Sequence, residues 1–199
     1  MLASASFALA AVACSSGDGR TLPPPDPHQT TTSVSAPVVG QPSAEGGSSD
    51  GAAVEVFSLS SPAFSRGAVI PDRLTCDGEG LSPPLAWAST PPAAELALVV
   101  RDRDAPFVHW VVTGIDPSVR GFGEDGVPEA AVEALNSAGQ PGWSPPCPPA
   151  GDAPHTYDFV LHALPEPLAL EAGMPGEEVA RMVEGASSDR AVLSATFGR

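Results

Sequence analysis

The sequence contains no lysine, so all nine basic residues are arginines, and they face 24 acidic residues. Schiff-base chemistry and a P-loop are excluded, because both depend on a lysine side chain. The formal net charge of −15 also opposes binding to the phosphate backbone of nucleic acids. We therefore expect no nucleic-acid partner for this chain of 199 residues.

Cysteine is scarce as well, and none of the three cysteines belongs to a C-x-x-C or zinc-finger spacing. Cys14 follows an apolar, alanine-rich run from Met1 to Ala13 that is too short to span a bilayer as a helix. This leader, residues 1–14, resembles a bacterial lipoprotein signal, which implies cleavage before Cys14, lipidation of its thiol and anchoring to the cell membrane. The alternative is an ordinary secretion signal, which would give a secreted or periplasmic protein.

Residues 15–51 are rich in Ser, Thr, Pro and Gly, and include His28. Such a segment cannot bury enough apolar surface to fold, so we interpret it as a disordered linker. The folded domain is then residues 52–199. In an exported domain Cys76 and Cys147 form an even pair, which leaves two alternatives, a disulfide or two free thiols.

Strand patterns dominate this domain. Some runs are continuously apolar and β-branched, as in buried strands, and others alternate apolar and polar residues. Five or more strands joined by proline-rich loops predict a mainly β fold, an antiparallel β-sandwich. The expected strands are Val54 to Phe57, Leu96 to Val100, Val108 to Val112, Tyr157 to Leu164 and Arg190 to Phe197.

One or two short helices are expected at the periphery. The segment from Pro175 to Gly185 has acidic residues in its first turn, a glycine near its end and apolar Val179, Met182 and Val183 on one side. A second candidate runs from Pro128 to Leu135 between glycine-rich loops.

Polar residues gather just after one expected strand and at the start of the next. Asp102 and Asp104 are two residues apart, so extended backbone would place both carboxylates on the same face. The Ala105–Pro106 bond is a candidate cis peptide in the following turn. His109 opens the next strand, so the chain return could bring its imidazole to the carboxylates.

A second loop carries another histidine. The segment Pro145 to Gly151 has too many prolines for a helix or a strand interior, so it should form a rigid wall. His155 follows it at the edge of an expected strand, where a pocket mouth would lie. His162 is in the middle of that strand and is expected to have a structural or surface role.

Three segments, Thr75 to Trp87, Asp102 to Val112 and Pro145 to Phe159, resemble motifs of the phosphatidylethanolamine-binding protein family. The similarity is to its bacterial and archaeal branch, called Raf kinase inhibitor-like, and extends over roughly Val54 to Arg199. It implies a two-sheet β-sandwich with a small anion pocket at one end. The pocket residues implied by the resemblance are Asp102, Asp104, His109 and His155, with Trp110, Pro146, Pro148 and Gly151 in its walls.

Departures from the family pattern affect the ligand more than the fold. Arg103 replaces a proline between the aspartates, Gly114 stands where asparagine is frequent, and Pro145 replaces a glycine at the start of the proline-rich loop. If Arg103 points inward, it adds a fork-shaped donor to the pocket.

Two carboxylates repel an anion, so the histidines must provide the attraction. An aspartate that accepts a hydrogen bond from one ring nitrogen fixes the tautomer, raises the imidazole pKa and turns the other nitrogen outward as a donor. Backbone N–H groups of the proline- and glycine-rich loop can complete the site. Phosphate, a phospholipid head group or a carboxylate would fit, with no cofactor and no catalysis.

Three alternatives stay open. Two Asp and two His could bind a divalent metal for hydrolysis, although their spacing is not a standard ligand spacing. Cys147 beside His155 could serve as a nucleophile unless a disulfide removes its thiol. The family resemblance also implies that an exported member could bind a protease as an inhibitor, or another envelope protein.

Overall fold

The computed structural model describes residues 56–168, 170–171 and 173–199. These residues belong to one compact unit, Asp50–Arg199. The leader, the linker, Cys14 and His28 lie outside the described residues, as do residues 52–55. Of the strand expected from Val54 to Phe57, only Val56 and Phe57 are described; neither is in a strand, and the first strand within the described residues starts at Ser58.

The smaller of two sheets contains three short strands. It has the order β1-β2-β5, and both pairings are antiparallel. Its strands are β1 (Ser58–Ser60), β2 (Leu85–Ala88) and β5 (Gly121–Phe122), and a 3-10 turn, η1 (Asp72–Leu74), lies between β1 and β2 in the chain.

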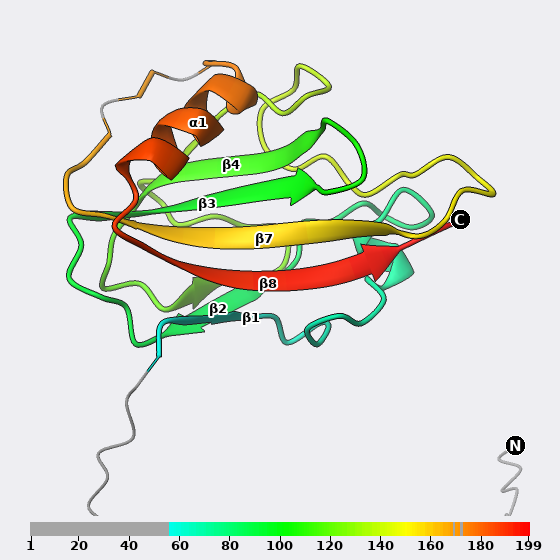
Figure 1. Ribbon diagram of the computed structural model, residues 1–199, viewed down its shortest axis with the longest axis horizontal. Helices are drawn as coiled ribbons and strands as arrows, with labels where there is room; N and C mark the ends of the chain where they lie inside the picture. The colour runs from blue at the N-terminus through cyan, green and yellow to red at the C-terminus, as the bar shows by residue number, and fades with distance from the viewer. Residues whose placement is uncertain (1–55, 169, 172) are drawn as a thin grey trace, which may run out of the picture. The chain divides into compact units, whose positions relative to one another are not determined.

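The larger sheet contains the long strands and has the order β6-β4-β3-β7-β8, again antiparallel throughout. It confirms four of the expected strands and the mainly β antiparallel fold. Figure 1 shows this sheet between β1 and β2 on one side and the helix α1 on the other. Its strands are β3 (Glu95–Asp102), β4 (Val108–Ile115), β6 (Val132–Glu133), β7 (His155–Leu164) and β8 (Asp189–Phe197).

Burial on both faces explains the continuously apolar runs of the large sheet. Leu96, Leu98 and Val100 of β3 belong to the core between the sheets, whereas Ala97 and Val99 pack under α1. A strand with two covered faces has no polar side, so strict alternation disappears. β3 is also paired on both edges, because it lies between β4 and β7.

Helix α1 (Gly176–Ala186) corresponds to the first expected helix. Its buried face is Gly176, Val179, Ala180 and Val183, a spacing of three and four residues. Met182 lies off that face and is 40% exposed, so its expected place beside Val179 was wrong. Within the described residues, no helix combines the length and the apolar character needed to cross a membrane.

The second expected helix, Pro128 to Leu135, is absent. Its central residues form β6, which pairs with Val112 and Thr113 at the edge of the large sheet. The edge backbone of β4 thus offers hydrogen bonds that override the weak helical propensity of an alanine- and glutamate-containing segment.

We predict opposite effects for two glycine substitutions in α1. A Cβ at Gly176 would overlap the carbonyl oxygen of Leu135, whereas a Cβ at Gly185 meets nothing within 4 Å. Gly176→Ala should lower the free energy of unfolding by about 1–3 kcal/mol through overpacking. Gly185→Ala, the matched control, should raise it by up to about 1 kcal/mol through helix propensity. Urea unfolding measures both; equal effects would contradict the close approach of α1 to Leu135.

Candidate functional site

The antiparallel order β4-β3-β7 brings three strand ends together. Arg101, near the end of β3, pairs with Val108 at the start of β4. On the other side, Asp102 pairs with Tyr157 near the start of β7. His109 and His155 therefore come to the same end of the sheet as Asp102, although they are far apart in the sequence.

His155 and Asp102 form the tightest polar contact at this end. The Nδ1 atom of His155 lies 2.6 Å from Oδ2 of Asp102, and their side chains are only 13% and 6% exposed. The other oxygen of Asp102 accepts a hydrogen bond from the backbone N–H of Asp104 at 2.8 Å. The hydrogen bond to Asp102 raises the pKa of His155, which favours an imidazolium with Nε2–H left for a ligand.

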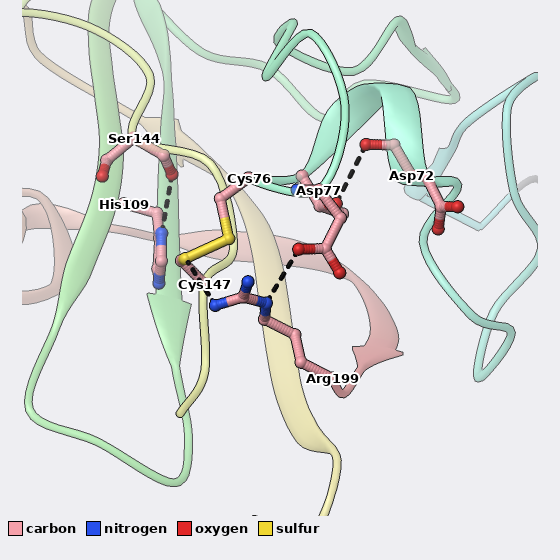
Figure 2. Close-up of a disulfide and its surroundings, with 8 residues drawn as sticks. Asp72, Cys76, Asp77, His109, Ser144, Cys147 and Arg199 are labelled. Carbon is pink, nitrogen blue, oxygen red and sulfur yellow. Dashed lines mark hydrogen bonds and ion pairs between the residues drawn. A yellow bond between two sulfur atoms is a disulfide. The ribbon is translucent and has the colours of Figure 1, made fainter. Parts of the chain in front are cut away.

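His109 has the opposite character. Its side chain is buried, and Nδ1 donates to the backbone carbonyl of Ser144 at 2.7 Å (Figure 2). Burial lowers the pKa of this imidazole, so the ring is neutral near pH 7. Since Nδ1 carries the proton, Nε2 presents a lone pair, and it has no partner among the described residues.

Tyr157 completes the polar floor of the site. It is fully buried on β7, and its ring packs edge-on to His109, with centroids 5.2 Å apart. Its hydroxyl group is also buried without a partner among the described residues. Burial raises the pKa of this phenol, so Tyr157 keeps its proton and can donate a hydrogen bond.

A cavity of about 190 Å³ lies over these groups. Four of the expected residues line it: Asp102, His109, Pro148 and His155. The proline-rich segment expected as a wall also contributes Pro145, Cys147 and Pro149. The other lining residues were not predicted, although Tyr157 is two residues from His155 in β7, where strand alternation could have indicated it. The additional lining residues are Ala105, Phe107, Ser144, Pro145, Cys147, Pro149 and Tyr157.

Two expected pocket residues lie beside the cavity. The carboxylate of Asp104 accepts the backbone N–H of Thr156 at 2.7 Å, so it fixes the start of β7 from outside. Trp110 is buried between the sheets, and its Nε1–H donates to Glu133 at 2.7 Å. The register of β4 against β3 shifts here, since Val100 pairs with Trp110 and Arg101 with Val108, so His109 and Trp110 do not alternate regularly. Both rings contact Trp143, and the hydrogen bond to Glu133 holds the Trp110 indole beside the cavity.

Two expected residues of the proline-rich loop also lie outside the lining. The carbonyl of Pro146 accepts the backbone N–H of Cys76 at 3.1 Å. The N–H of Gly151 donates to the carbonyl of Arg199 at 3.1 Å, so it is not available to an anion. Both backbone groups instead attach the loop to neighbouring segments.

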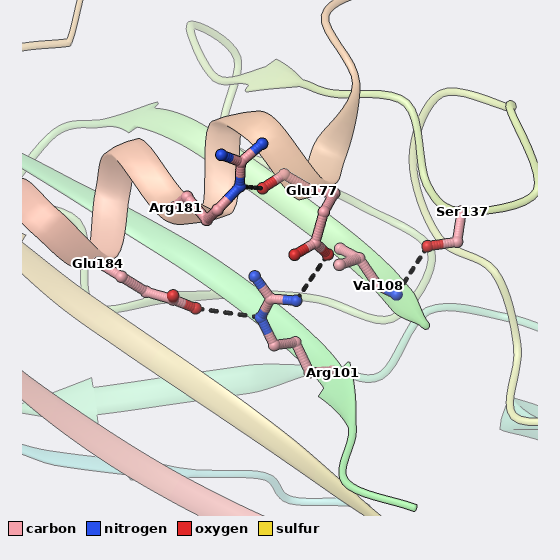
Figure 3. Close-up of polar contacts among 6 residues, drawn as sticks. All are labelled: Arg101, Val108, Ser137, Glu177, Arg181 and Glu184. Carbon is pink, nitrogen blue, oxygen red and sulfur yellow. Dashed lines mark hydrogen bonds and ion pairs between the residues drawn. The ribbon is translucent and has the colours of Figure 1, made fainter. Parts of the chain in front are cut away.

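The two arginines flanking Asp102 are both directed away from the cavity. Arg101 points to α1, where it pairs with Glu177 at 2.8 Å and with Glu184 at 3.0 Å (Figure 3). Arg103 is 62% exposed and lies 3.4 Å from Asp158, so it does not add the inward donor that its position suggested. The carboxylate of Asp102 therefore pairs with His155 and with neither arginine.

The turn after β3 differs from expectation in one further respect. No cis peptide bond occurs among the described residues, so the candidate cis bond at Ala105–Pro106 was wrong. The Asx hydrogen bond from Asp104 N–H to Asp102 and the bond from Phe107 N–H to the Ala105 carbonyl form this turn with trans peptides.

A disulfide joins Cys76 to Cys147, with their Cα atoms 5.4 Å apart. Its Sγ atom at Cys147 lies 3.7 Å from the guanidinium of Arg199, which also pairs with Asp77 at 2.8 Å (Figure 2). The disulfide therefore attaches the proline-rich wall covalently to the segment after η1, and the Arg199–Asp77 ion pair attaches the C-terminus to that same segment. With Cys147 in a disulfide, its thiol is not available as a nucleophile.

Metal-ligand geometry is absent from the described part of the chain, where no group of three or more His, Cys, Asp or Glu side chains is placed to hold an ion.

His162 is 2% exposed, so it has a structural role in the interior and is not a surface residue. Burial lowers the pKa of His162 to about 4, so this ring is neutral near pH 7.

The chain is similar to a family model, to several bacterial proteins and to solved structures, and these comparisons agree with one another. Residues 60–198 match the family model described as phosphatidylethanolamine-binding protein. A Mycobacterium tuberculosis protein named lipoprotein LppC is 39% identical over 184 residues, which cover 91% of this chain and 85% of that protein. The Mycobacterium bovis UPF0098 protein Mb1945c is 42% identical over 146 residues, covering 72% and 71%.

Two solved structures are similar along their whole length. The phosphatidylethanolamine-binding protein homologue CT736 of Chlamydia trachomatis is 37% identical with a TM-score of 0.66, covering 72% of this chain and 97% of that one. For E. coli YbcL, a member of the same family, the identity is 27% and the TM-score 0.68, with 72% and 98% covered.

We predict that the disulfide stabilises both the fold and the pocket wall. It closes a loop with a sequence separation of 71 residues, so the double variant Cys76→Ser, Cys147→Ser should lose about 2–4 kcal/mol of unfolding free energy. Its affinity for methyl phosphate should fall as well, because the wall is released. Reduced wild-type protein should behave like the variant; a variant as stable as the oxidised wild type would contradict the prediction.

Proposed function

The chain belongs to the phosphatidylethanolamine-binding protein family, and we propose that it is an exported, non-catalytic binding protein whose cavity holds a small phosphoryl head group. The observation that supports this most is the difference between its two histidines. His155 offers an N–H and a positive charge, and His109 offers a lone pair. The carboxylate of Asp102 is already paired with His155, so its charge is compensated before a ligand arrives.

The ligand best suited to this pair is an anion that still carries one proton. An acceptor oxygen would take the Nε2–H of His155, and a hydroxyl on the same phosphorus would donate to Nε2 of His109. The phenol of Tyr157 is a further donor at the cavity floor. A singly protonated phosphomonoester has all these features, whereas a carboxylate or a phosphodiester leaves the His109 lone pair without a donor.

The size of the cavity limits what else it can contain. Its volume of about 190 Å³ is below the range of about 300–1,000 Å³ that is typical of sites for drug-sized ligands. The site is therefore suited to a head group whose remaining part extends past the proline-rich wall. Apolar side chains at the rim, Phe107 and Pro148 among them, would contact that part.

Export and a lipid anchor at Cys14 belong to the same proposal. They rest on the leader sequence and on the relative named lipoprotein LppC, whose alignment covers 91% of this chain. A lipidated chain would place the cavity near a membrane surface. Protease inhibition and other envelope partners stay alternatives, and no contact among the described residues favours them.

The affinity for anions should fall as pH rises. Dimethyl phosphate keeps one negative charge across the range, so its binding reports on the protein alone. Below the raised pKa of His155 the affinity should be constant; above it, Nε2–H is lost and the affinity should fall by up to about tenfold per pH unit. Titration calorimetry between pH 5 and 9 measures this, and a flat profile would refute the role of His155.

Two variants separate the charge of His155 from its position. His155→Gln should weaken binding at pH 6 by at least about tenfold, which corresponds to the loss of one hydrogen bond from a charged group. The same variant should flatten the pH profile. Asp102→Asn should move the midpoint of the profile to lower pH, because the carboxylate that raises the pKa of His155 is gone.

At pH 6, methyl phosphate should bind the wild type more tightly than dimethyl phosphate, since only its monoanion can donate to His109.

Lipidation has a separate test. In a bacterial host, the wild-type chain should partition into the detergent phase of Triton X-114, and Cys14→Ser should move it to the aqueous phase, because the acyl chains require the thiol. The Cys76→Ser, Cys147→Ser variant is the matched control and should stay in the detergent phase. Aqueous partitioning of the wild type would contradict the anchor.

A further inference from the structure

A second cavity is lined in part by the residues that directly precede the wall of the anion pocket. It has a volume of about 320 Å³ and is lined by Trp110 of β4, Glu133 of the edge strand β6 and residues of the neighbouring loops. Residues 141–143 line this cavity, and the next two residues, Ser144 and Pro145, line the anion pocket. The two cavities have different linings except for this shared segment of chain.

Aromatic rings form part of the wall. Trp110 and Trp143 both line the cavity, and their rings meet nearly edge-on with centroids 5.7 Å apart. The Nε1–H of Trp143 is fully buried and has no partner among the described residues. Indole faces attract cations through the ring quadrupole, and alkylated ammonium ions are their typical ligands.

The charged groups at this cavity are all acidic. Asp125 and Glu133 line it, and none of the described lining residues is an arginine or a histidine. Arg73, near the same loop, is engaged by Glu124 at 3.0 Å. This lining is the reverse of the anion pocket, where a histidine compensates the aspartate.

Glu133 is held in place without being neutralised. It is half-buried, one of its oxygens accepts the Nε1–H of Trp110 at 2.7 Å, and no ion pair reaches it from the described residues. The absence of a side chain at Gly142 leaves room for this carboxylate, because a Cβ there would lie 2.9 Å from Oε1. A half-buried carboxylate without a cation is costly unless a ligand supplies one.

From these contacts we infer that the cavity between Trp110, Trp143, Glu133 and Asp125 is a binding site for a small organic cation of the alkylammonium type. The cation lies against the half-buried indole of Trp143, with the buried Trp110 behind it. Its charge is compensated by Glu133 and Asp125, and a hydroxyl on the ligand accepts the free Nε1–H of Trp143. The site acts independently of the anion pocket and does not depend on the function proposed for it.

Choline and its uncharged isostere 3,3-dimethylbutan-1-ol are suitable probes. Two of the three tryptophans line the cavity, so intrinsic fluorescence of the purified full chain reports binding directly. Choline should change the emission with saturation, and the isostere should bind at least tenfold more weakly. Equal responses to both compounds, or no saturable response to choline, would overturn the inference.

Matched variants locate the charge that matters. Glu133→Gln keeps an acceptor for Trp110 and should weaken choline binding at least tenfold. Glu129→Gln removes the same charge from an exposed residue outside the lining and should leave the affinity unchanged. Equal weakening by both variants would show a general electrostatic effect and overturn the inference.

Two further variants keep the test decisive. If near-ultraviolet circular dichroism shows that Glu133→Gln is misfolded, Asp125→Asn replaces it, since asparagine tolerates the positive φ of 56° at this position. Asp125→Asn should weaken choline binding at least threefold, and unchanged affinity would contradict the site. His155→Gln should bind choline as the wild type does; loss of binding there would place the cation in the anion pocket and overturn the inference.

Discussion

The pairing register of β3 with β4 and β7 is the constraint on which the site depends. It sets Asp102 opposite Tyr157 and Arg101 opposite Val108, so the end of one strand meets the beginnings of two others. A shift of one residue would turn the aspartate and both histidines to the wrong face. The apolar core on both sides of the large sheet prevents such a shift, because every buried side chain of β3 would move with it.

Within this frame, burial and hydrogen bonding give two chemically identical side chains different properties. Asp102 favours the charged form of His155, whereas burial lowers the pKa of His109 and leaves it neutral, with its proton held on Nδ1 by the Ser144 carbonyl. The neighbouring arginines do not disturb the pair, since Arg101 is held by α1 and Arg103 by Asp158. The disulfide keeps the proline-rich wall over both rings. The site is thus a preformed donor and acceptor pair.

The sequence predicted the parts of this arrangement that depend on local pattern. The apolar runs of β3 and β4, the alternation of β7 and the turn at Asp102 are such features, and the family resemblance indicated the histidines. Local sequence pattern could not predict β6, because Val132 and Glu133 become a strand only through pairing with β4. The position of Trp110 outside the pocket depends on the register shift between β3 and β4 and on its hydrogen bond to Glu133. The choice between a disulfide and free thiols depends on distances across 71 residues.

The opposite protonation of the two histidines is tested most directly by nuclear magnetic resonance of their ring nitrogens as a function of pH, with His109→Gln and His155→Gln used for assignment. The expected result is that His155 titrates above its ordinary pKa of 6.5 and His109 below it. Near pH 7, His109 should be the neutral tautomer with its proton on Nδ1. A His109 that titrates above His155, or that carries its proton on Nε2, would contradict a pocket built from one donor and one acceptor.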